Sequence, residues 1–280
     1  MSMRDLPAAD VSSRPGLRTE LMPSALNRWN PEVRAAQADD ENTISILDPI
    51  GADFFGDGVT SKRVSAALRS IGKKDVTVSI NSPGGDYFEG LAIYNLLRDH
   101  PAKVTVKIVG IAASAASIIA MAGDEVQIAR AGFLMIHNAW VVAIGDKNQL
   151  RDVANWLAPF DAMSADIYAA RTGLDVKDIT KMLDAETWIG GADAVDQGFA
   201  DDLLPADQVD SKTKNSAEGK SVLAAHKIET MLARTGLSKS ERRELIGAMK
   251  GGMSSAAPTG MSGAAVIAEV EGLLSFTRSI

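Results

Sequence analysis

The stretch GIAASAASIIAMAGD, residues 110–124, indicates whether this chain is a membrane protein or a globular protein. It is apolar and rich in alanine, yet it contains Ser114 and Ser117, and no charged residue lies between Lys107 and Asp124. The uncharged run is shorter than the roughly 20 residues that span a bilayer. A tightly packed buried element and a sheltered nucleophile remain as alternatives, and both place the stretch inside a globular protein.

Composition narrows the class of protein. The chain has 280 residues, 46% of them hydrophobic, and no cysteine, which excludes disulfides, thiolate metal sites and a cysteine nucleophile. The net charge of −7, concentrated in residues 1–205, argues against sequence-independent nucleic-acid binding. Residues 1–20 lack the apolar core of a secretory signal, so we predict a cytoplasmic protein. We expect no metal site and no cofactor.

The chain divides into three parts. Residues 1–42 are polar, with one apolar anchor around Trp29, and are predicted to be an arm or linker. Residues 43–205 alternate strand and helix patterns, which is typical of an α/β architecture with buried strands. Residues 206–280 are predicted to form a scaffold-like or partner-binding extension with too few aromatic residues for a large core. It consists of a linker, 206–220, and three predicted helical segments, 221–236, 238–252 and 264–276.

Individual elements follow from local patterns. Strands are expected within 45–51, 76–80, 104–110, 125–129 and 133–137. The longest helical pattern, 146–171, carries a mainly apolar stripe of Leu150, Val153, Leu157, Phe160, Ser164 and Ile167. Pro159 should kink this helix or break it in two. The segment 186–204 is predicted to form a helix, a glycine turn and a final strand.

Covalent catalysis by serine needs a hydroxyl, a base, an orienting acid and donors for the oxyanion, and the sequence offers a candidate for each. His137 ends an apolar strand, whereas His100 lies in a surface turn and His226 in the polar tail. Ser114 is expected at the start of a helix, where a developing negative charge is favoured, although a packing role is equally consistent with these residues alone. Ser117, one turn later, is expected to be buried and bonded to the helix backbone.

The turn NSPGGD, residues 81–86, offers donors for an oxyanion. Two glycines between a strand and a helix let backbone N–H groups face outward without a Cβ atom in the way. By itself such a turn is most often only a turn. It matches neither the dinucleotide-binding fingerprint nor the phosphate loop, so we exclude both.

Four motifs in order, INSPGGD, GIAASAAS, LMIHN and ETWIGGADAVDQGFADDL, resemble the ClpP-type serine peptidase family. Within that family the chain most resembles the ClpP-related head-maturation (prohead) proteases of tailed bacteriophages. The similarity runs from about Thr43 to Leu204. It implies a ClpP/crotonase-like spiral of ββα units, flanked by the N-terminal arm and the helical C-terminal tail.

The resemblance also implies roles for single residues. By motif, the nucleophile is Ser114, the general base is His137, and the oxyanion-hole donors are the N–H groups of Gly85 and Ala115. Glu186 occupies the position of the third triad member, where the family usually has Asp, and Asp184 is the competing acid.

The implied function is cofactor-free peptide hydrolysis through an acyl-enzyme, with capsid or scaffold proteins as substrates. The resemblance further implies a homo-oligomeric ring with inward-facing sites, working in a host cytoplasm or procapsid without nucleic-acid or membrane partners. Helix 146–171 would contribute to contacts between stacked rings. Two alternatives stay open: a crotonase-like acyl-coenzyme A enzyme on the same fold, and an inactive structural component of capsid assembly.

Overall fold

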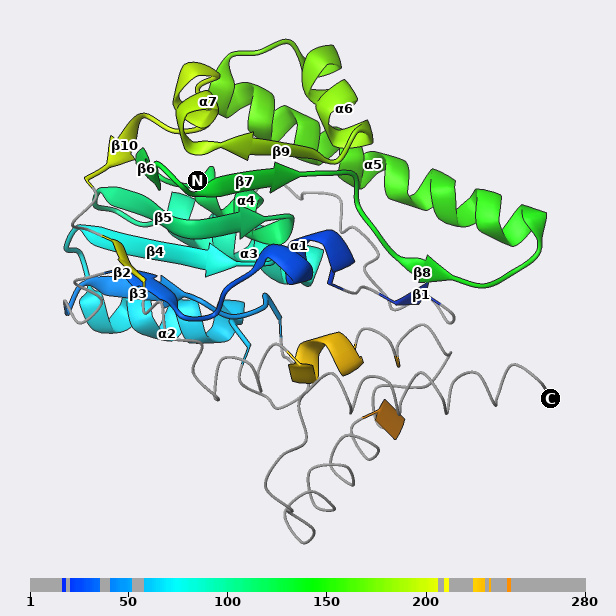
Figure 1. Cartoon of the computed structure of the whole chain (residues 1–280), viewed down its shortest axis with the longest axis horizontal. Coiled ribbons are helices and arrows are strands. Elements are labelled where there is room, and N and C mark those ends of the chain that lie inside the picture. Colours follow the sequence, from blue (N-terminus) through cyan, green and yellow to red (C-terminus); the bar gives the residue numbers. More distant parts are fainter. Residues whose placement is uncertain are drawn as a thin grey trace, which may run out of the picture.

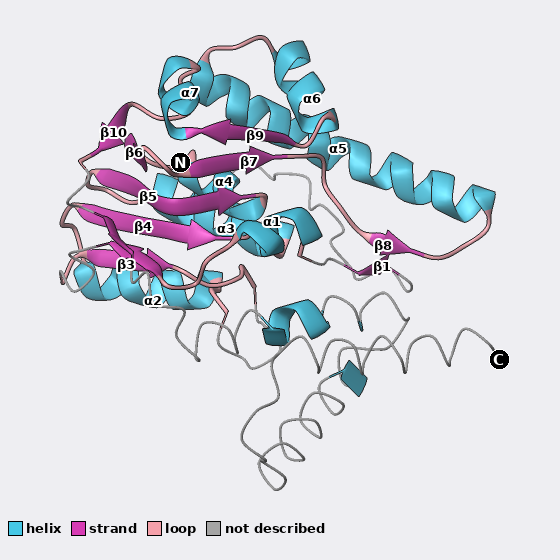
Figure 2. Ribbon diagram, viewed as in Figure 1, coloured by secondary structure: helices cyan, strands magenta, loops and turns pink. Residues whose placement is uncertain are grey.

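The structure is a computed structural model that describes residues 17–18, 21–35, 41–51, 58–205, 209–211, 224–229, 232 and 241–242. Figures 1 and 2 show a central sheet with helices on both of its faces, so the predicted α/β architecture is confirmed. In the described residues, no helix is long and apolar enough to span a bilayer.

Within the described residues, five parallel strands form the main part of the sheet in the order β10–β6–β5–β4–β3. They are β3 (Thr43–Ile46), β4 (Val76–Ser82), β5 (Val104–Ala113), β6 (Glu125–Ala129) and β10 (Asp202–Leu204). Val78 of β4 lies beside Val106 of β5, which lies beside Val126 of β6. These β-branched residues are buried, as expected of parallel strands covered on both faces.

Strand β5 changes its partner along its length. The partner strand at its end is β7 (Phe133–Ile136), and β7 in turn pairs with the antiparallel strand β9 (Thr187–Gly190). The first part of β5 pairs with β6, whereas residues 111–113 pair in parallel with β7. Gly110 lies at the change of partner, where a Cβ atom would come within 2.4 Å of Asn81 Oδ1. Only glycine leaves space for the Asn81 side chain there.

Alternate residues of β5 face two different layers, because successive side chains of a strand point to opposite faces. The main core lies between the sheet and the helices α2 (Ser61–Ile71), α3 (Tyr87–Arg98) and α4 (Ala115–Ala120), and buried residues from helices farther along the chain add to it, namely Ala165, Tyr168, Ile179, Leu183 and Ala194. Val106 and Ile108 belong to this core. Ile111 and Ala113 belong to a second cluster on the other face, which α1 (Pro23–Arg28) covers (Figure 1).

The segment that contains α1 packs closely on the sheet. Trp29 is 2% exposed and donates its indole N–H to the carbonyl oxygen of Asn81 at 2.9 Å. The Asn81 amide in turn donates to the carbonyl oxygens of Asn30 and Val33 at 2.6 and 3.1 Å. The predicted anchor at Trp29 is therefore a buried residue, and residues 29–33 are hydrogen-bonded to Asn81 of the sheet. Strand β2 (Val33–Ala35) then pairs with β11 (Val209–Ser211).

Helix α5 (Lys147–Thr172) is continuous through Pro159, so the alternative of two separate helices is wrong. A capping box at Asp146 starts the helix, and Gly173, with φ 75°, ends it. Its buried residues all lie in the C-terminal half and are Ser164, Ala165 and Tyr168. The N-terminal half projects beyond the sheet (Figure 1), and Leu150 is 44% exposed. The predicted stripe therefore packs into the core over only part of its length.

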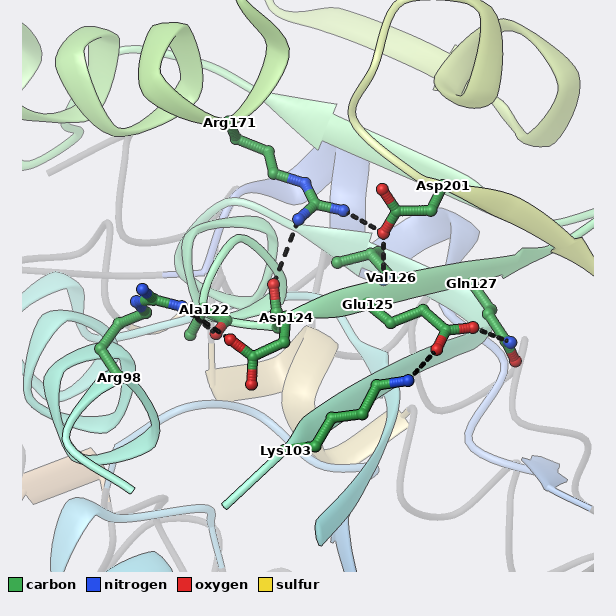
Figure 3. Close-up of polar contacts among 10 residues, drawn as sticks. Arg98, Lys103, Ala122, Asp124, Glu125, Val126, Gln127, Arg171 and Asp201 are labelled. Carbon is green, nitrogen blue, oxygen red and sulfur yellow. Dashed lines mark hydrogen bonds and ion pairs between the residues drawn. The ribbon is translucent and has the colours of Figure 1, made fainter. Parts of the chain in front are cut away.

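Polar contacts fasten the C-terminal end of α5 to the edge of the sheet (Figure 3). Arg171 donates to the carbonyl oxygen of Gly123 at 3.1 Å and pairs with the carboxylate of Asp201. The same carboxylate accepts the N–H of Val126 at 2.7 Å. The Arg171 side chain is 14% exposed and that of Asp201 is 49% exposed, so the ion pair is shielded from water only on the side of the arginine.

The segment 186–204 contains the predicted helix, glycine turn and final strand, but a strand that was not predicted precedes them. It starts with strand β9, continues with α7 (Gly191–Asp196) and ends with β10. Residues 187–190 are extended because they pair with β7, with Trp188 opposite Met135. Helix α6 (Val176–Asp184) precedes this segment, and the short strands β1 (Leu17–Arg18) and β8 (Val142–Ala143) pair with each other.

Part of the predicted C-terminal extension is described. Residues 224–229 are helical, within the first predicted tail helix, while the last predicted helix, 264–276, lies outside the described residues. His226 is 3% exposed and packs edge-on against Trp29, with ring centroids 5.8 Å apart. His226, which the sequence places in the polar tail, is therefore a buried residue.

Candidate active site

The turn after β5 presents Ser114 at the start of α4. Ser114 has φ 56° and ψ −126°, a region that residues other than glycine rarely adopt. Its N–H donates to the carbonyl oxygen of Met135 at 2.8 Å. A Cβ atom on Gly84 would lie 2.7 Å from the Cβ of Ser114, and one on Gly90 would lie 2.9 Å from the Cβ of Ala115. The small residues therefore make room for a strained turn that resembles the nucleophile turn of other hydrolases.

His137 directly follows β7 and meets Ser114. Because Ala113 pairs with Met135 in parallel register, β5 and β7 end side by side. The Nε2 of His137 lies 2.7 Å from the Oγ of Ser114, within the distance at which an imidazole can accept the hydroxyl proton. The structure thus brings together the two residues proposed as nucleophile and base.

The surroundings of His137 favour its neutral form. Burial lowers the pKa of the imidazole, and this effect exceeds the opposing effects of the Glu186 charge and a hydrogen bond with the backbone of Asn138. A neutral imidazole is the form that can take a proton from a serine hydroxyl. Both the contact with Ser114 and the neutral form of the imidazole therefore suit His137 as a general base.

The two candidate acids have different partners. Asp184, at the end of α6, is exposed and accepts a hydrogen bond from Asn138 Nδ2 at 2.7 Å. Glu186 is half-buried, has φ 49°, and accepts the indole N–H of Trp188 at 3.5 Å. Among the described residues, neither carboxylate hydrogen-bonds to the ring of His137, but the charge of Glu186 raises the pKa of that ring. This electrostatic interaction favours Glu186 over Asp184 as the acid that supports His137.

Two backbone N–H groups are available beside the serine. Gly84 and Gly85 have φ 86° and 147°, and the N–H of Gly84 is taken by Ser82 Oγ at 3.2 Å. In the described part of the chain, the N–H groups of Gly85 and Ala115 have no protein acceptor, so they can donate to an oxyanion. A Cβ atom on Gly85 would lie 2.2 Å from the carbonyl oxygen of Ile50, so glycine is required there.

One pocket joins these groups. It is lined by Gly85, Tyr87, Ser114, Ala115, Ile118, His137, Asn138, Ala139, Trp140, Ser164 and Tyr168. These residues come from the turn before α3, from α4, from the segment after β7 and from α5. Segments far apart in sequence therefore build a single site.

Asp161 on α5 is a neighbour of this site that sequence patterns did not single out. Its carboxylate accepts the N–H of Ala139 at 2.6 Å, while Asp184 holds Asn138 next to it. Burial raises the pKa of Asp161, the N–H of Ala139 lowers it, and the nearby charge of Asp184 raises it. Two carboxylates from two helices thus fix the first residues after the histidine. No local signal in the sequence could have shown this, because it depends on how α5 packs against the end of β7.

The other candidate groups have structural partners. Ser117 is fully buried, donates to the carbonyl oxygen of Ser114 at 2.6 Å and bonds to the Tyr168 hydroxyl at 2.8 Å, as its predicted structural role requires. His100 bonds through Nε2 to the carbonyl oxygen of Lys74 at 2.8 Å. Among the described residues, no group of three or more His, Cys, Asp or Glu side chains is arranged to hold a metal ion.

Comparisons with known proteins cover the whole pocket. The sequence model of a family described as Clp protease matches residues 36–207. The ATP-dependent Clp protease proteolytic subunit of Ligilactobacillus salivarius is 31% identical over 134 residues, which cover 47% of this chain and 68% of the relative. Proteolytic subunit 3 of Rhodococcus jostii is 31% identical over 135 residues, which cover 47% and 66%. Proteolytic subunit 1 of Streptomyces coelicolor is 27% identical over 208 residues, which cover 71% and 92%.

Proposed function

The chain belongs to the Clp protease family and is a serine-type peptidase with a ClpP/crotonase-like α/β fold, and we propose that Ser114, His137 and Glu186 form its catalytic triad. The observation that supports this most directly is the 2.7 Å contact between Ser114 Oγ and His137 Nε2. Glu186 is proposed as the orienting acid because its charge raises the pKa of His137. Asp184 is proposed to hold Asn138 instead.

The proposed reaction is endopeptidic hydrolysis through an acyl-enzyme. His137 takes the proton of Ser114 while Oγ attacks the carbonyl carbon of the scissile peptide. The N–H groups of Gly85 and Ala115 stabilise the negative charge that develops on the carbonyl oxygen. His137 then protonates the leaving amine and later activates the water that hydrolyses the ester. No cofactor takes part in these steps.

Labelling with a fluorophosphonate tests the proposed nucleophile, because the probe bonds covalently to an activated serine hydroxyl. We expect labelling of the wild type at Ser114 and none in Ser114→Ala, together with a loss of peptide hydrolysis of about 10⁶-fold. Ser117→Ala, one turn along the same helix, is the matched control and should still be labelled. Labelling that persists in Ser114→Ala contradicts the assignment.

The same experiment separates the remaining alternatives. An inactive structural component predicts no labelling of the wild type. A crotonase-like enzyme predicts binding in a coenzyme A titration, which a peptidase does not require.

We also propose a biological role, namely maturation of bacteriophage heads by cleavage of capsid or scaffold proteins in the host cytoplasm or the procapsid. The support is the ordered set of motifs from INSPGGD to ETWIGGADAVDQGFADDL, which resembles the head-maturation proteases. Purified enzyme mixed with procapsids of its own phage should cut the capsid or scaffold protein, and Ser114→Ala should not. Intact procapsid proteins in the presence of labelled, active enzyme contradict this role.

A homo-oligomeric ring with inward-facing active sites is the proposed assembly. The Clp protease family consists of oligomeric ring peptidases that act on protein substrates. In addition, the projecting half of α5 and the loop before it expose apolar side chains, among them Ile144 at 81% and Leu150 at 44%. A second copy that covers these side chains would remove them from water. Sedimentation that shows a fully active monomer contradicts the proposal.

The flanking segments are proposed to serve the peptidase domain, residues 43–205. The arm, residues 1–42, and the extension, residues 206–280, meet where His226 packs on Trp29. We propose that the extension is scaffold-like or binds a partner. Truncation after Pro205 should then impair capsid assembly more than peptide hydrolysis, and unchanged assembly would contradict the idea.

A further inference from the structure

The size of the pocket beside Ser114 constrains the substrate. Its enclosed part has a volume of about 30 Å³, whereas the whole depression, including the space open to solvent, measures about 410 Å³. The pocket also contains the serine and the two proposed oxyanion donors. The carbonyl group that is attacked therefore binds here, and we place the side chain of its residue in the enclosed part of the same pocket. We call this residue the acyl-side residue, because it lies on the N-terminal side of the scissile bond and remains in the acyl-enzyme.

The most buried lining residues of this pocket come from α4 and α5, and Tyr87 lines it as well. Ile118, Ser164 and Tyr168 line it and are 3%, 2% and 1% exposed. The hydroxyl of Tyr87 donates to the carbonyl oxygen of Phe160 at 2.9 Å and lies 3.0 Å from Ser164 Oγ. Two hydrogen bonds thus tie the first residue of α3 to α5 across the pocket.

Aromatic packing holds the Tyr87 ring in place. Its centroid lies 5.6 Å from that of Phe88 and 5.8 Å from that of Phe160, and these two rings pack edge to face. The hydroxyl of Tyr168, another lining residue, is hydrogen-bonded to Ser117, so the position of its ring is fixed as well. A large side chain could enter only by displacing Tyr87 and losing these contacts.

We propose that this chain, acting through its proposed function as a serine endopeptidase, cleaves after Ala, Ser or Gly, and that Tyr87 excludes larger acyl-side residues. A methyl or hydroxymethyl group fits the available space, whereas a branched or aromatic side chain does not. Charged side chains are disfavoured too, because the lining residues include no Asp, Glu, Lys or Arg and burial of an unpaired charge is costly. This substrate preference belongs to the pocket beside Ser114 at which the proposed peptidase reaction takes place.

A panel of acylated tripeptide coumarin amides tests this proposal, because the residue before the coumarin is the acyl-side residue by construction. The panel carries Ala, Ser, Leu, Phe or Lys at that position, and rates are normalised to active sites titrated with a fluorophosphonate. We expect kcat/KM of the wild type for Ala and Ser to exceed that for Leu and Phe by at least about 10-fold.

Two variants test the role of Tyr87. Tyr87→Ala is expected to raise the ratio of kcat/KM for Leu to that for Ala by about 10-fold or more. Tyr87→Phe keeps the ring but loses both hydrogen bonds, so it should shift the ratio less, in the same direction. Tyr94→Ala is the control: it removes a ring farther along α3 that does not line the pocket, and it should keep the wild-type ratio.

The outcomes distinguish this proposal from the function on which it rests. A labelled wild type that prefers Leu or Phe overturns the small-residue selectivity and leaves the peptidase function intact. A ratio unchanged in every labelled Tyr87 variant overturns the role of Tyr87. A wild type that the fluorophosphonate does not label overturns the proposed triad itself.

Discussion

Replacement of Glu186 by Gln tests which acid supports His137 during the reaction. Gln keeps nearly the same shape but has no charge. When His137 takes the proton of Ser114, it becomes a cation in a half-buried position, so a nearby negative charge stabilises the transition state. At the roughly 4–6 Å over which opposite charges shift a pKa, this attraction is about 3–4 kcal/mol at an effective dielectric constant of ~20. We therefore expect kcat to fall about 10²- to 10³-fold.

The same change should move the acid limb of the pH profile in one direction. Activity needs the neutral imidazole, so the rate falls as the pH drops through the pKa of His137. Burial lowers this pKa, and the charge of Glu186 opposes that effect. Without the charge the pKa falls further, and the acid limb of kcat/KM moves to lower pH. Glu186→Gln should be slower than the wild type and yet keep its residual rate at lower pH.

The assay is kcat/KM on a fluorogenic peptide across the pH range in which histidine titrates. Asp184→Asn is the matched control, because Asp184 is exposed and bonded to Asn138. Its effect should be at most about 5-fold, which corresponds to one hydrogen bond of about 1 kcal/mol. The reasoning is refuted if Asp184→Asn costs more activity than Glu186→Gln, or if the acid limb of Glu186→Gln moves to higher pH.

Other measurements separate stability from activity. Trp29→Ala should lower the free energy of unfolding by about 3–5 kcal/mol, because a buried indole is lost. Leu150→Ala, at an exposed position, should change the free energy of unfolding of the monomer by less than about 0.5 kcal/mol. Equal denaturation midpoints for the two variants would contradict this prediction. Asp161→Ala should raise KM more than Asp161→Asn, which keeps an acceptor for the N–H of Ala139; equal KM values would oppose that role. In the wild type, the acid limb set by His137 should have its midpoint below pH 6.5, and a higher midpoint would show that burial does not dominate.

Local pattern predicted the parallel strands well and β9 poorly. Residues 76–80 and 104–108 are dense in β-branched side chains, and such runs favour a buried strand wherever they occur. The segment 187–190 lies between two helices and has no such run. It is extended because the edge of β7 supplies hydrogen bonds to it, which is a tertiary effect.

Helix α5 shows the same limit. Its period predicted an apolar stripe but not which half of that stripe would be buried. Periodicity defines a face of a helix, whereas burial depends on where the neighbouring elements end. The sheet and α4 meet only the C-terminal half of α5, and the N-terminal half extends past them (Figure 1).

The amino-acid sequence alone specifies the available chemistry: three histidines, no cysteine, a serine among small residues and a Gly-Gly turn. It also determined the α/β alternation, because the periods of apolar residues are local properties of the chain. Only the tertiary structure decided which groups meet. The parallel register of β5 and β7 sets Ser114 beside His137, and the docking of α5 adds Tyr168, Ser164 and the carboxylate of Asp161. Distances between segments far apart in the chain result from the packing of the whole core, and no short stretch of sequence encodes them.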